Sequence, residues 1–187
     1  MVSRRISKNS RGFLINIKKM YKAILFDMVG PLLVKRSDYV SDGTVEVAEN
    51  LFSADALEKE SQLIEKIVDK YCKVEKVWSE LLPQLKKKYK LGVINNGASV
   101  TVPFFKSKHP FDRYFDIFLN SDEEKMSKPD AGIYLLACEK LGVLPQDCVF
   151  IDDLAENVEG AKALGMTGIV YTNYDILISQ LTELKII

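Results

Sequence analysis

Short continuous apolar runs alternate with longer segments of helical periodicity along most of this chain. The apolar runs predict strands at 22–27, 91–95, 117–119, 148–152 and 168–171. Apolar residues repeat at helical spacing between them, most clearly over 131–141, 156–164 and 174–185. Alternating strands and helices predict an α/β fold, in which helices cover both faces of a three-layer, doubly wound parallel sheet.

The interval between the first two predicted strands is too long for one crossover. It spans about sixty residues, whereas a crossover needs only one helix. Its periodicity predicts helices at 45–52, 54–71 and 74–88, and we expect the last to be the crossover. Residues 35–72 would then form a small helical cap, inserted into a core of residues 20–34 and 73–187. Such a cap would cover a cleft, and a plain helical packing layer is the alternative.

Composition and charge disfavour several classes of function. The chain has 187 residues, and its 26 basic and 26 acidic side chains balance, so neither nucleic acid nor a membrane is expected as a partner. Cys72, Cys138 and Cys148 are unclustered, which is typical of reduced, buried thiols in a cytoplasmic protein. The single histidine, His109, lies in a polar segment and is expected on a surface loop, which disfavours serine–histidine catalysis.

The first nineteen residues differ from the rest in composition. Residues 1–19 include basic but no acidic side chains, and their apolar stretch at 13–15 is too short for a signal peptide or a membrane span. Because Met20 directly precedes the first strand, we interpret residues 1–19 as a disordered basic extension outside the fold. An upstream extension or alternative start ranks first as its origin, and an amphipathic organelle signal second.

Two predicted strands end on acidic residues. Asp27 follows one apolar run, and Asp152 and Asp153 end another. Open α/β sheets bind ligands beyond the carboxyl ends of their strands, so we expect these carboxylates to share a cleft. Their mutual repulsion favours a hard divalent cation, and Mg²⁺ first. The alternative for each aspartate is a helix N-cap or the start of a loop.

Four motifs in order give the chain a family resemblance. They are Asp27-Met28-Val29-Gly30-Pro31-Leu32, Val93-Ile94-Asn95-Asn96-Gly97, Ser127-Lys128-Pro129-Asp130, and Val149-Phe150-Ile151-Asp152-Asp153 with Asn157-Val158-Glu159-Gly160-Ala161. Over residues 21–171 the chain resembles the haloacid dehalogenase-like (HAD) superfamily. It is most similar to the subfamily IA branch, which contains sugar-phosphate phosphatases and the phosphatase domain of soluble epoxide hydrolase. The resemblance implies a Rossmann-like core with a cap.

The resemblance also implies roles for the motif residues. Asp27 would be the nucleophile that forms an aspartyl-phosphate, and Lys128 would be a fixed positive charge beside it. The alternative for Lys128 is a solvated lysine before a helix. Mg²⁺ would be bound by Asp27, the main-chain carbonyl of Val29, and Asp152, with Asp153 as a water-mediated partner. Backbone N–H groups of Met28 and Val29, in the loop after Asp27, and of Asn96 and Gly97 would cradle the phosphate oxygens, and the side-chain amide of Asn95 would contact them.

Three residues depart from the pattern of the family. Val29 stands where most of these phosphatases carry a second aspartate as general acid, and losing such a group typically costs on the order of 10²–10⁴ in rate. Asn95 replaces a serine or threonine, although its amide retains a donor for phosphate. Pro31 removes one backbone donor from the loop after the nucleophile.

These observations favour a Mg²⁺-dependent phosphohydrolase that acts on a small phosphorylated metabolite. Without an acid at Val29, we expect slow turnover and a preference for good leaving groups, such as acyl or anomeric sugar phosphates. The alternative is a catalytically degenerate relative that binds a phosphorylated ligand or a protein partner in the same cleft. A phosphonate hydrolase ranks lower, and so does a dehalogenase, which needs neither Mg²⁺ nor the acidic pair. The sequence indicates neither the substrate nor the oligomeric state.

Overall fold

The computed structural model describes residues 5–8, 14–17, 19–35, 72–74, 76–97, 99, 102–103, 106 and 109–187. Nearly all of the predicted cap, with its helices at 45–52 and 54–71, lies outside these residues.

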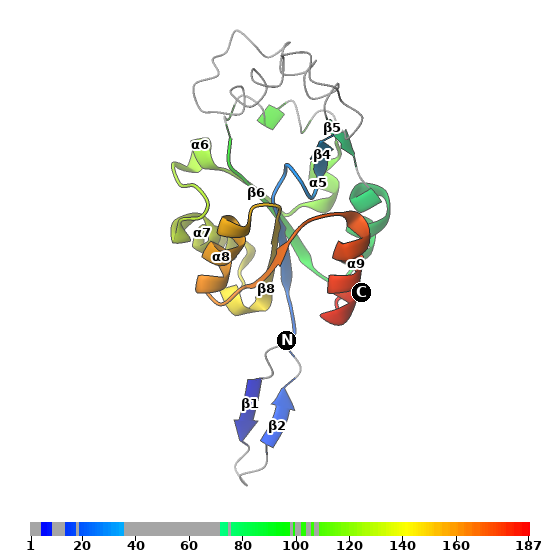
Figure 1. Ribbon diagram of the computed structural model, residues 1–187. Coiled ribbons are helices and arrows are strands. Elements are labelled where there is room, and N and C mark those ends of the chain that lie inside the picture. Colours follow the sequence, from blue (N-terminus) through cyan, green and yellow to red (C-terminus); the bar gives the residue numbers. More distant parts are fainter. Residues whose placement is uncertain are drawn as a thin grey trace.

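A five-stranded parallel sheet forms the centre of the molecule (Figure 1). Its strands, in spatial order, are β7 (Ile117–Asn120), β6 (Lys90–Asn95), β3 (Ala23–Phe26), β8 (Cys148–Asp152) and β9 (Thr167–Val170). These are the strands predicted from the apolar runs, with ends that differ by no more than one residue. β3 and β8 are buried along their whole length, which is why they read as unbroken apolar runs.

Helices cover both faces of this sheet, so the predicted three-layer α/β architecture is confirmed (Figure 1). On one face, Ala23 and Leu25 of β3 pack in a cluster with residues of α7 (Ala131–Leu141) and α8 (Ala155–Ala163). On the other face, Ile24 and Phe26 pack in a cluster with α5 (Phe111–Tyr114) and α9 (Tyr174–Glu183). Successive residues of one strand therefore serve opposite cores, as the two-residue period of a strand requires.

The crossover before β6 differs from its prediction as a single helix over 74–88. Val74 ends strand β5 (Cys72–Val74), which pairs antiparallel with β4 (Leu33–Lys35). Helical structure follows as the π-helical segment η2 (Val77–Leu81) and α3 (Leu82–Leu85). Pairing with β4 satisfies the backbone groups around Val74, a non-local effect that helical periodicity does not register. Four large apolar residues of this crossover are buried: Trp78, Leu81, Leu82 and Leu85.

The N-terminal residues include a strand pair that was not predicted from the sequence. Strands β1 (Arg5–Lys8) and β2 (Leu14–Ile17) pair with each other in an antiparallel hairpin, where the sequence analysis expects disorder. This hairpin is a sheet of its own and adds no strand to the central sheet. Residues 5–8 and 14–17 therefore form strands outside the central sheet, and the disorder expected for residues 1–19 as a whole stays a prediction.

Two further short elements complete the described fold: α6 (Ser121–Glu124) and η3 (Pro145–Asp147). Cys138 and Cys148 are buried free thiols, as predicted, with their sulfur atoms 3.8 Å apart. His109 is half-buried and packs against Trp78, with ring centroids 5.1 Å apart, rather than projecting from a surface loop.

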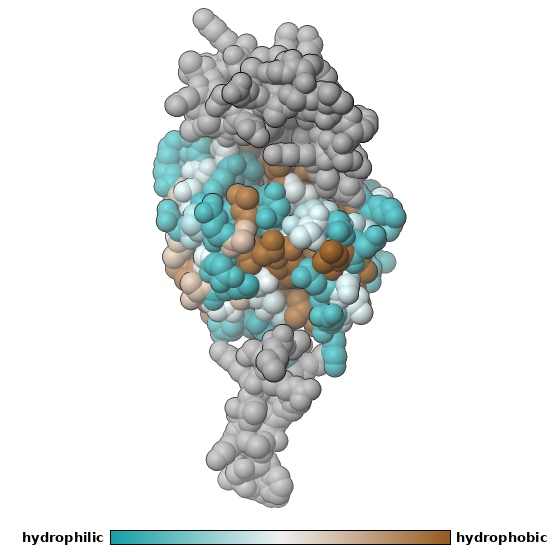
Figure 2. Space-filling model, in the orientation of Figure 1, coloured by the Kyte–Doolittle hydropathy of each residue, from teal (hydrophilic) through white to brown (hydrophobic). Residues whose placement is uncertain are grey.

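The described surface is mostly hydrophilic, with some exposed apolar residues (Figure 2). Figure 2 shows hydrophobic residues between α8 and α9, surrounded by hydrophilic ones. Among the described residues, the exposed large apolar side chains are Met20, Leu135, Leu144, Leu154 and Ile176. No helix within the described ranges is long and apolar enough to span a bilayer.

Candidate active site

Asp27 and Asp152 lie at the carboxyl ends of the two central strands. Phe26 pairs with Ile151 in the parallel ladder, and the Asp27 N–H donates to the Ile151 carbonyl at 2.8 Å, so the next residue of each strand reaches the same edge. The chain continues from β3 towards β6 and from β8 towards β9, on opposite sides. A crevice opens where strand order reverses in this way, which makes the point between these strands the expected ligand site of the sheet.

Three carboxylates converge at this point. One oxygen each of Asp27, Asp152 and Asp153 lies within 4.8 Å of the others. Asp27 and Asp152 are buried, at 7% and 0% exposure, whereas Asp153 is exposed. An all-oxygen set of this kind, with one solvent-accessible member, suits a hard cation such as Mg²⁺.

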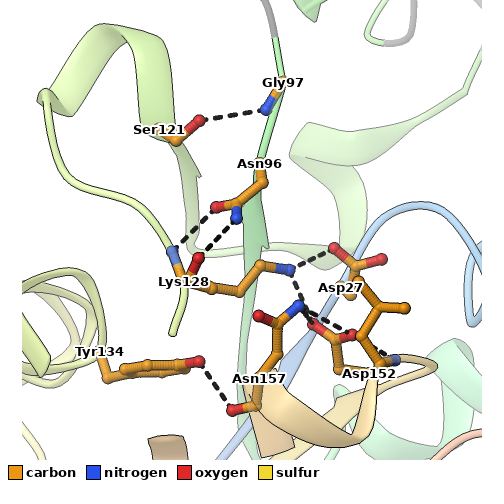
Figure 3. A network of polar contacts seen from close by, with 9 residues as sticks. Asp27, Asn96, Gly97, Ser121, Lys128, Tyr134, Asp152 and Asn157 are labelled. Carbon is orange, nitrogen blue, oxygen red and sulfur yellow. Dashed lines mark hydrogen bonds and ion pairs between the residues drawn. The ribbon is translucent and has the colours of Figure 1, made fainter. Parts of the chain in front are cut away.

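Lys128 provides a buried positive charge between two of these acids (Figure 3). Its side chain is only 1% exposed, and its Nζ pairs with Asp27 Oδ1 and, at 2.8 Å, with Asp152 Oδ2. A buried ammonium is tolerated only when it is paired, and here two carboxylates pair it. The sequence prediction that Lys128 lies beside Asp27 therefore matches the structure, whereas the solvated alternative does not.

The charges of this cluster do not balance. Burial raises the pKa of Asp27 to about 7; Lys128 opposes the rise, while Asp152 and Asp153 add to it. One ammonium thus does not compensate three carboxylates, and a further cation at this point would hold Asp27 ionised.

Asp152 is fixed by donors from several directions. Its Oδ1 accepts from the Leu154 N–H at 2.8 Å, and the Asn157 Nδ2 donates to both carboxylate oxygens at 3.2 and 3.1 Å. The main-chain carbonyl of Asn157 accepts from the buried hydroxyl of Tyr134 at 2.7 Å (Figure 3). The sequence reasoning assigned no role to Asn157 or Tyr134. For Asn157, the available signal was its position five residues after Asp152, in the first turn of a helix.

The residues predicted to cradle phosphate are only partly free to do so. The Gly97 N–H donates to Ser121 Oγ at 3.1 Å. The side chain of Asn96, whose backbone N–H is the predicted contact, is hydrogen-bonded to the main chain of Lys128. Asn95 is buried at the end of β6 and pairs in register with Asn120 of β7. A phosphate contact by these three residues stays a prediction.

The loop after Asp27 is shaped by a glycine. Gly30 has a φ of +107°, and a Cβ there would lie 2.7 Å from Asp153 Cγ, so only glycine lets the loop pack on that carboxylate. The Met28 side chain belongs to the core, and its carbonyl accepts from the Leu32 and Leu33 N–H groups at 3.3 and 2.9 Å. Val29 is half-buried and forms a bridge with Leu33; its role as a carbonyl ligand stays a prediction.

A cavity of about 340 Å³ adjoins the site over the ends of β6 and β7. Polar and charged side chains line most of it, together with one methionine. Its lining residues are Gly97, Ser121, Asp122, Lys125, Met126, Ser127 and Asp130.

Residues 55–165 match the family of haloacid dehalogenase-like hydrolases. This match covers more than half of the chain. The protein belongs to that family. The resemblance found in the four motifs is thereby confirmed, and the described fold is that of a HAD-like hydrolase.

Individual relatives of this HAD-like protein include a phosphatase and a dehalogenase. A phosphorylated carbohydrates phosphatase of Thermotoga maritima is 39% identical over 67 residues, which are 34% of this chain and 31% of the relative. An (S)-2-haloacid dehalogenase of Burkholderia cepacia is 33% identical over 88 residues, 46% of this chain and 38% of the relative. The matched part thus spans well under half the length of these relatives.

A solved structure shares the fold. A HAD family enzyme from Bacteroides thetaiotaomicron, in complex with magnesium and inorganic phosphate, superposes with a TM-score of 0.66 at 19% identity. The match covers 84% of this chain and 98% of that one. At this identity, the likeness establishes the fold alone.

Proposed function

We propose that this HAD-like protein is a Mg²⁺-dependent phosphohydrolase that acts on a small phosphorylated metabolite with Asp27 as nucleophile. The observation that carries the proposal is the placement of Asp27, which is buried at a strand end, paired with Lys128 and within 4.8 Å of two further carboxylates. The match of the Thermotoga phosphatase supports the same chemistry.

The reaction would proceed in two displacements. An ionised Asp27 oxygen attacks phosphorus, and the bond from phosphorus to the leaving oxygen breaks with its electron pair. The Lys128 ammonium stabilises the ionised carboxylate before attack and the charge on the phosphoryl oxygens during it. Water then attacks the aspartyl-phosphate, which releases inorganic phosphate and restores the Asp27 carboxylate.

The acidic cluster fits Mg²⁺. Asp27, Asp152 and the Val29 carbonyl would hold it, with Asp153 as a water-mediated partner, because the three carboxylates provide oxygen ligands and excess negative charge at one point. The Bacteroides neighbour, which shares the fold, is a complex with magnesium and inorganic phosphate. When bound, Mg²⁺ would neutralise charge on the phosphoryl oxygens and lower the pKa of Asp27.

Val29 bears on the choice of substrate. An apolar side chain two residues after the nucleophile donates no proton to the leaving oxygen. We therefore expect acyl phosphates and anomeric sugar phosphates, which leave with little protonation, to be the better substrates. Equal kcat/KM for acetyl phosphate and for glycerol 3-phosphate would contradict this preference.

The decisive experiment is a panel of phosphate esters assayed with Mg²⁺ beside an Asp27→Asn variant. We expect measurable release of inorganic phosphate, and its loss by a factor on the order of 10³ or more in Asp27→Asn, because the amide is not a nucleophile. Turnover that persists in that variant overturns the role of Asp27.

A second candidate is a non-catalytic protein that binds a phosphorylated ligand in this cleft. It is favoured by Val29 and by the engagement of the Asn96 amide and the Gly97 N–H within the protein. Thermal stabilisation by a phosphorylated ligand, without turnover in the same panel, identifies this case.

We also infer a cap at residues 35–72 and a cytoplasmic location. The pairing of Lys35 with Cys72 in β4 and β5 brings the two ends of the interval together, as an inserted unit requires. Two buried free thiols, Cys138 and Cys148, support a reducing compartment.

A further inference from the structure

We propose that Asn96 is a positioning residue, whose side chain holds the main chain of Lys128 so that the ammonium group lies between Asp27 and Asp152. The Asn96 Nδ2 donates to the Lys128 carbonyl at 2.8 Å, and the Lys128 N–H donates to the Asn96 Oδ1 at 3.0 Å. The two bonds join both polar atoms of one side chain to both main-chain polar groups of one residue (Figure 3).

Lys128 needs such a support because of where its main chain lies. It belongs to the segment between α6 and α7, outside regular secondary structure, so no ladder or helix fixes its peptide groups. Its long side chain must nonetheless reach two buried carboxylates, Asp27 and Asp152. Holding a lysine side chain in one conformation costs entropy. Fixing the main chain at both ends of the residue removes part of that cost.

Helix α8 also packs closely against the segment that contains Lys128. Gly160 of α8 faces Pro129, and a Cβ at Gly160 would lie 2.6 Å from the Pro129 carbonyl oxygen. Lys128 is thus held between the end of β6, through Asn96, and helix α8, which packs against the next residue. Asn96 itself is exposed, so its replacement removes these two bonds without opening the core.

This assignment concerns the side chain of Asn96, whereas the sequence predicted a phosphate contact by its backbone N–H. A direct contact between the Asn96 side chain and phosphate would act whether or not Lys128 is present. A positioning role makes its effect pass through the Lys128 ammonium. The two roles therefore predict different results when both residues are changed.

The first test measures the accessibility of Lys128 and is independent of any activity. In the unchanged protein, acylation of Lys128 by an N-hydroxysuccinimide ester, followed by mass spectrometry, should be slow compared with that of the exposed Lys22. Their side chains are 1% and 61% exposed. In Asn96→Ala we expect the rate at Lys128 to rise roughly tenfold, because two hydrogen bonds that hold its main chain are lost.

Ser121→Ala is the matched control, since it removes the neighbouring hydrogen bond to the Gly97 N–H and leaves both bonds to Lys128 in place. It should leave the labelling rate of Lys128 unchanged. Asn96→Asp retains the oxygen that accepts from the Lys128 N–H and should give an intermediate rate. An unchanged rate in Asn96→Ala, with Lys22 labelling also unchanged, overturns the proposal.

The second test rests on the proposed function. It measures, by calorimetry, the binding of inorganic phosphate in the presence of Mg²⁺. Asn96→Ala should weaken phosphate affinity roughly tenfold in the native background and add nothing in a Lys128→Met background. Losses that add in the double variant show a direct contact and overturn the positioning role. Failure of the unchanged protein to bind phosphate contradicts the proposed function instead, and the labelling result then decides the role of Asn96.

Discussion

At the scale of single residues, the candidate site depends on how completely its buried charges are paired. Asp152 has no exposed surface, yet Lys128, the Leu154 N–H and the Asn157 amide all donate to its carboxylate. A carboxylate held in this way presents its remaining lone pairs in a fixed direction. The amide of Asn157 should therefore matter to a bound cation that it does not touch.

Replacing Asn157 by leucine tests this. Leucine has a similar volume but no donor, so Asp152 loses one of the groups that orient it. We expect Mg²⁺ affinity, measured by calorimetry, to fall roughly 10- to 100-fold. The matched control is Asn173→Ala, which removes the asparagine at the N-cap of α9, whose Oδ1 accepts from the Ile176 N–H at 3.0 Å. It should lower stability by about 1 kcal/mol without changing Mg²⁺ affinity. Equal Mg²⁺ affinities for Asn157→Leu and the native protein would refute the orienting role.

The cavity beside the site contains a carboxylate whose ionisation favours the fold. Hydrogen bonds from Ser99 and then Lys125 lower the pKa of Asp122 from 3.8 to about 2. Because the folded pKa lies below the unfolded one, the ionised form stabilises the fold above about pH 4, and this contribution is lost as pH falls towards 2. Asp122→Asn should lower the melting temperature at pH 6, and the difference from the native protein should shrink steadily below pH 4. A difference that stays constant over that range would contradict the assignment.

The sequence was informative about which residues approach the site and less so about what each atom does there. Asp27, Lys128, Asp152 and Asp153 were all predicted, since each follows a recognisable strand or precedes a recognisable helix. The hydrogen bonds of Asn96 and Asn157 were not predicted. In a sequence motif, an asparagine that contacts a ligand cannot be told from one that bonds to a neighbouring group of the protein. That distinction depends on a fraction of an ångström in the packing of loops.

At the scale of elements, the strands that carry the site were predictable and the crossover was not. β3 and β8 are buried on both faces, so their apolar runs are unbroken and bounded by polar residues. The start of the crossover depends instead on whether Val74 pairs with Leu33, its partner in β4, and that pairing is far away in sequence. Local periodicity therefore placed the start of the predicted helix at Val74, which is the last residue of β5.

The contact between α8 and the Lys128 segment gives a prediction at this scale. Gly160→Ala would ordinarily favour a helix, but the new Cβ would lie 2.6 Å from the Pro129 carbonyl. We expect a net destabilisation of about 1–3 kcal/mol in urea unfolding, together with a lower affinity for phosphate, because the segment that carries Lys128 must move. Gly132→Ala in α7 is the matched control, since its Cβ would meet only the flexible end of Met126. That control should be neutral or slightly stabilising; a Gly160→Ala protein that behaves in the same way would show that the close approach has no consequence.

At the scale of the whole molecule, the parallel sheet β7-β6-β3-β8-β9 explains why the acidic side chains of the candidate site lie at one edge. All five strands point the same way, so every strand-to-helix connection at their carboxyl ends opens on the same side (Figure 1). The fold class was predictable because alternation of strands and helices permits few other arrangements. The N-terminal hairpin was not, because its composition reads as that of a polar tail.

The position of β3 between β6 and β8 also determines when this site comes into existence. Asp27 emerges from the ribosome among the first residues of the central sheet, and Asp152 only after three of its other strands have been made. Until then, Asp27 has neither Lys128 nor its second carboxylate for long-range pairing, and such non-local contacts form late in folding. Until Lys128 and Asp152 have been made, the nascent chain therefore carries Asp27 as an ordinary acid, without the partners on which its proposed role as nucleophile depends.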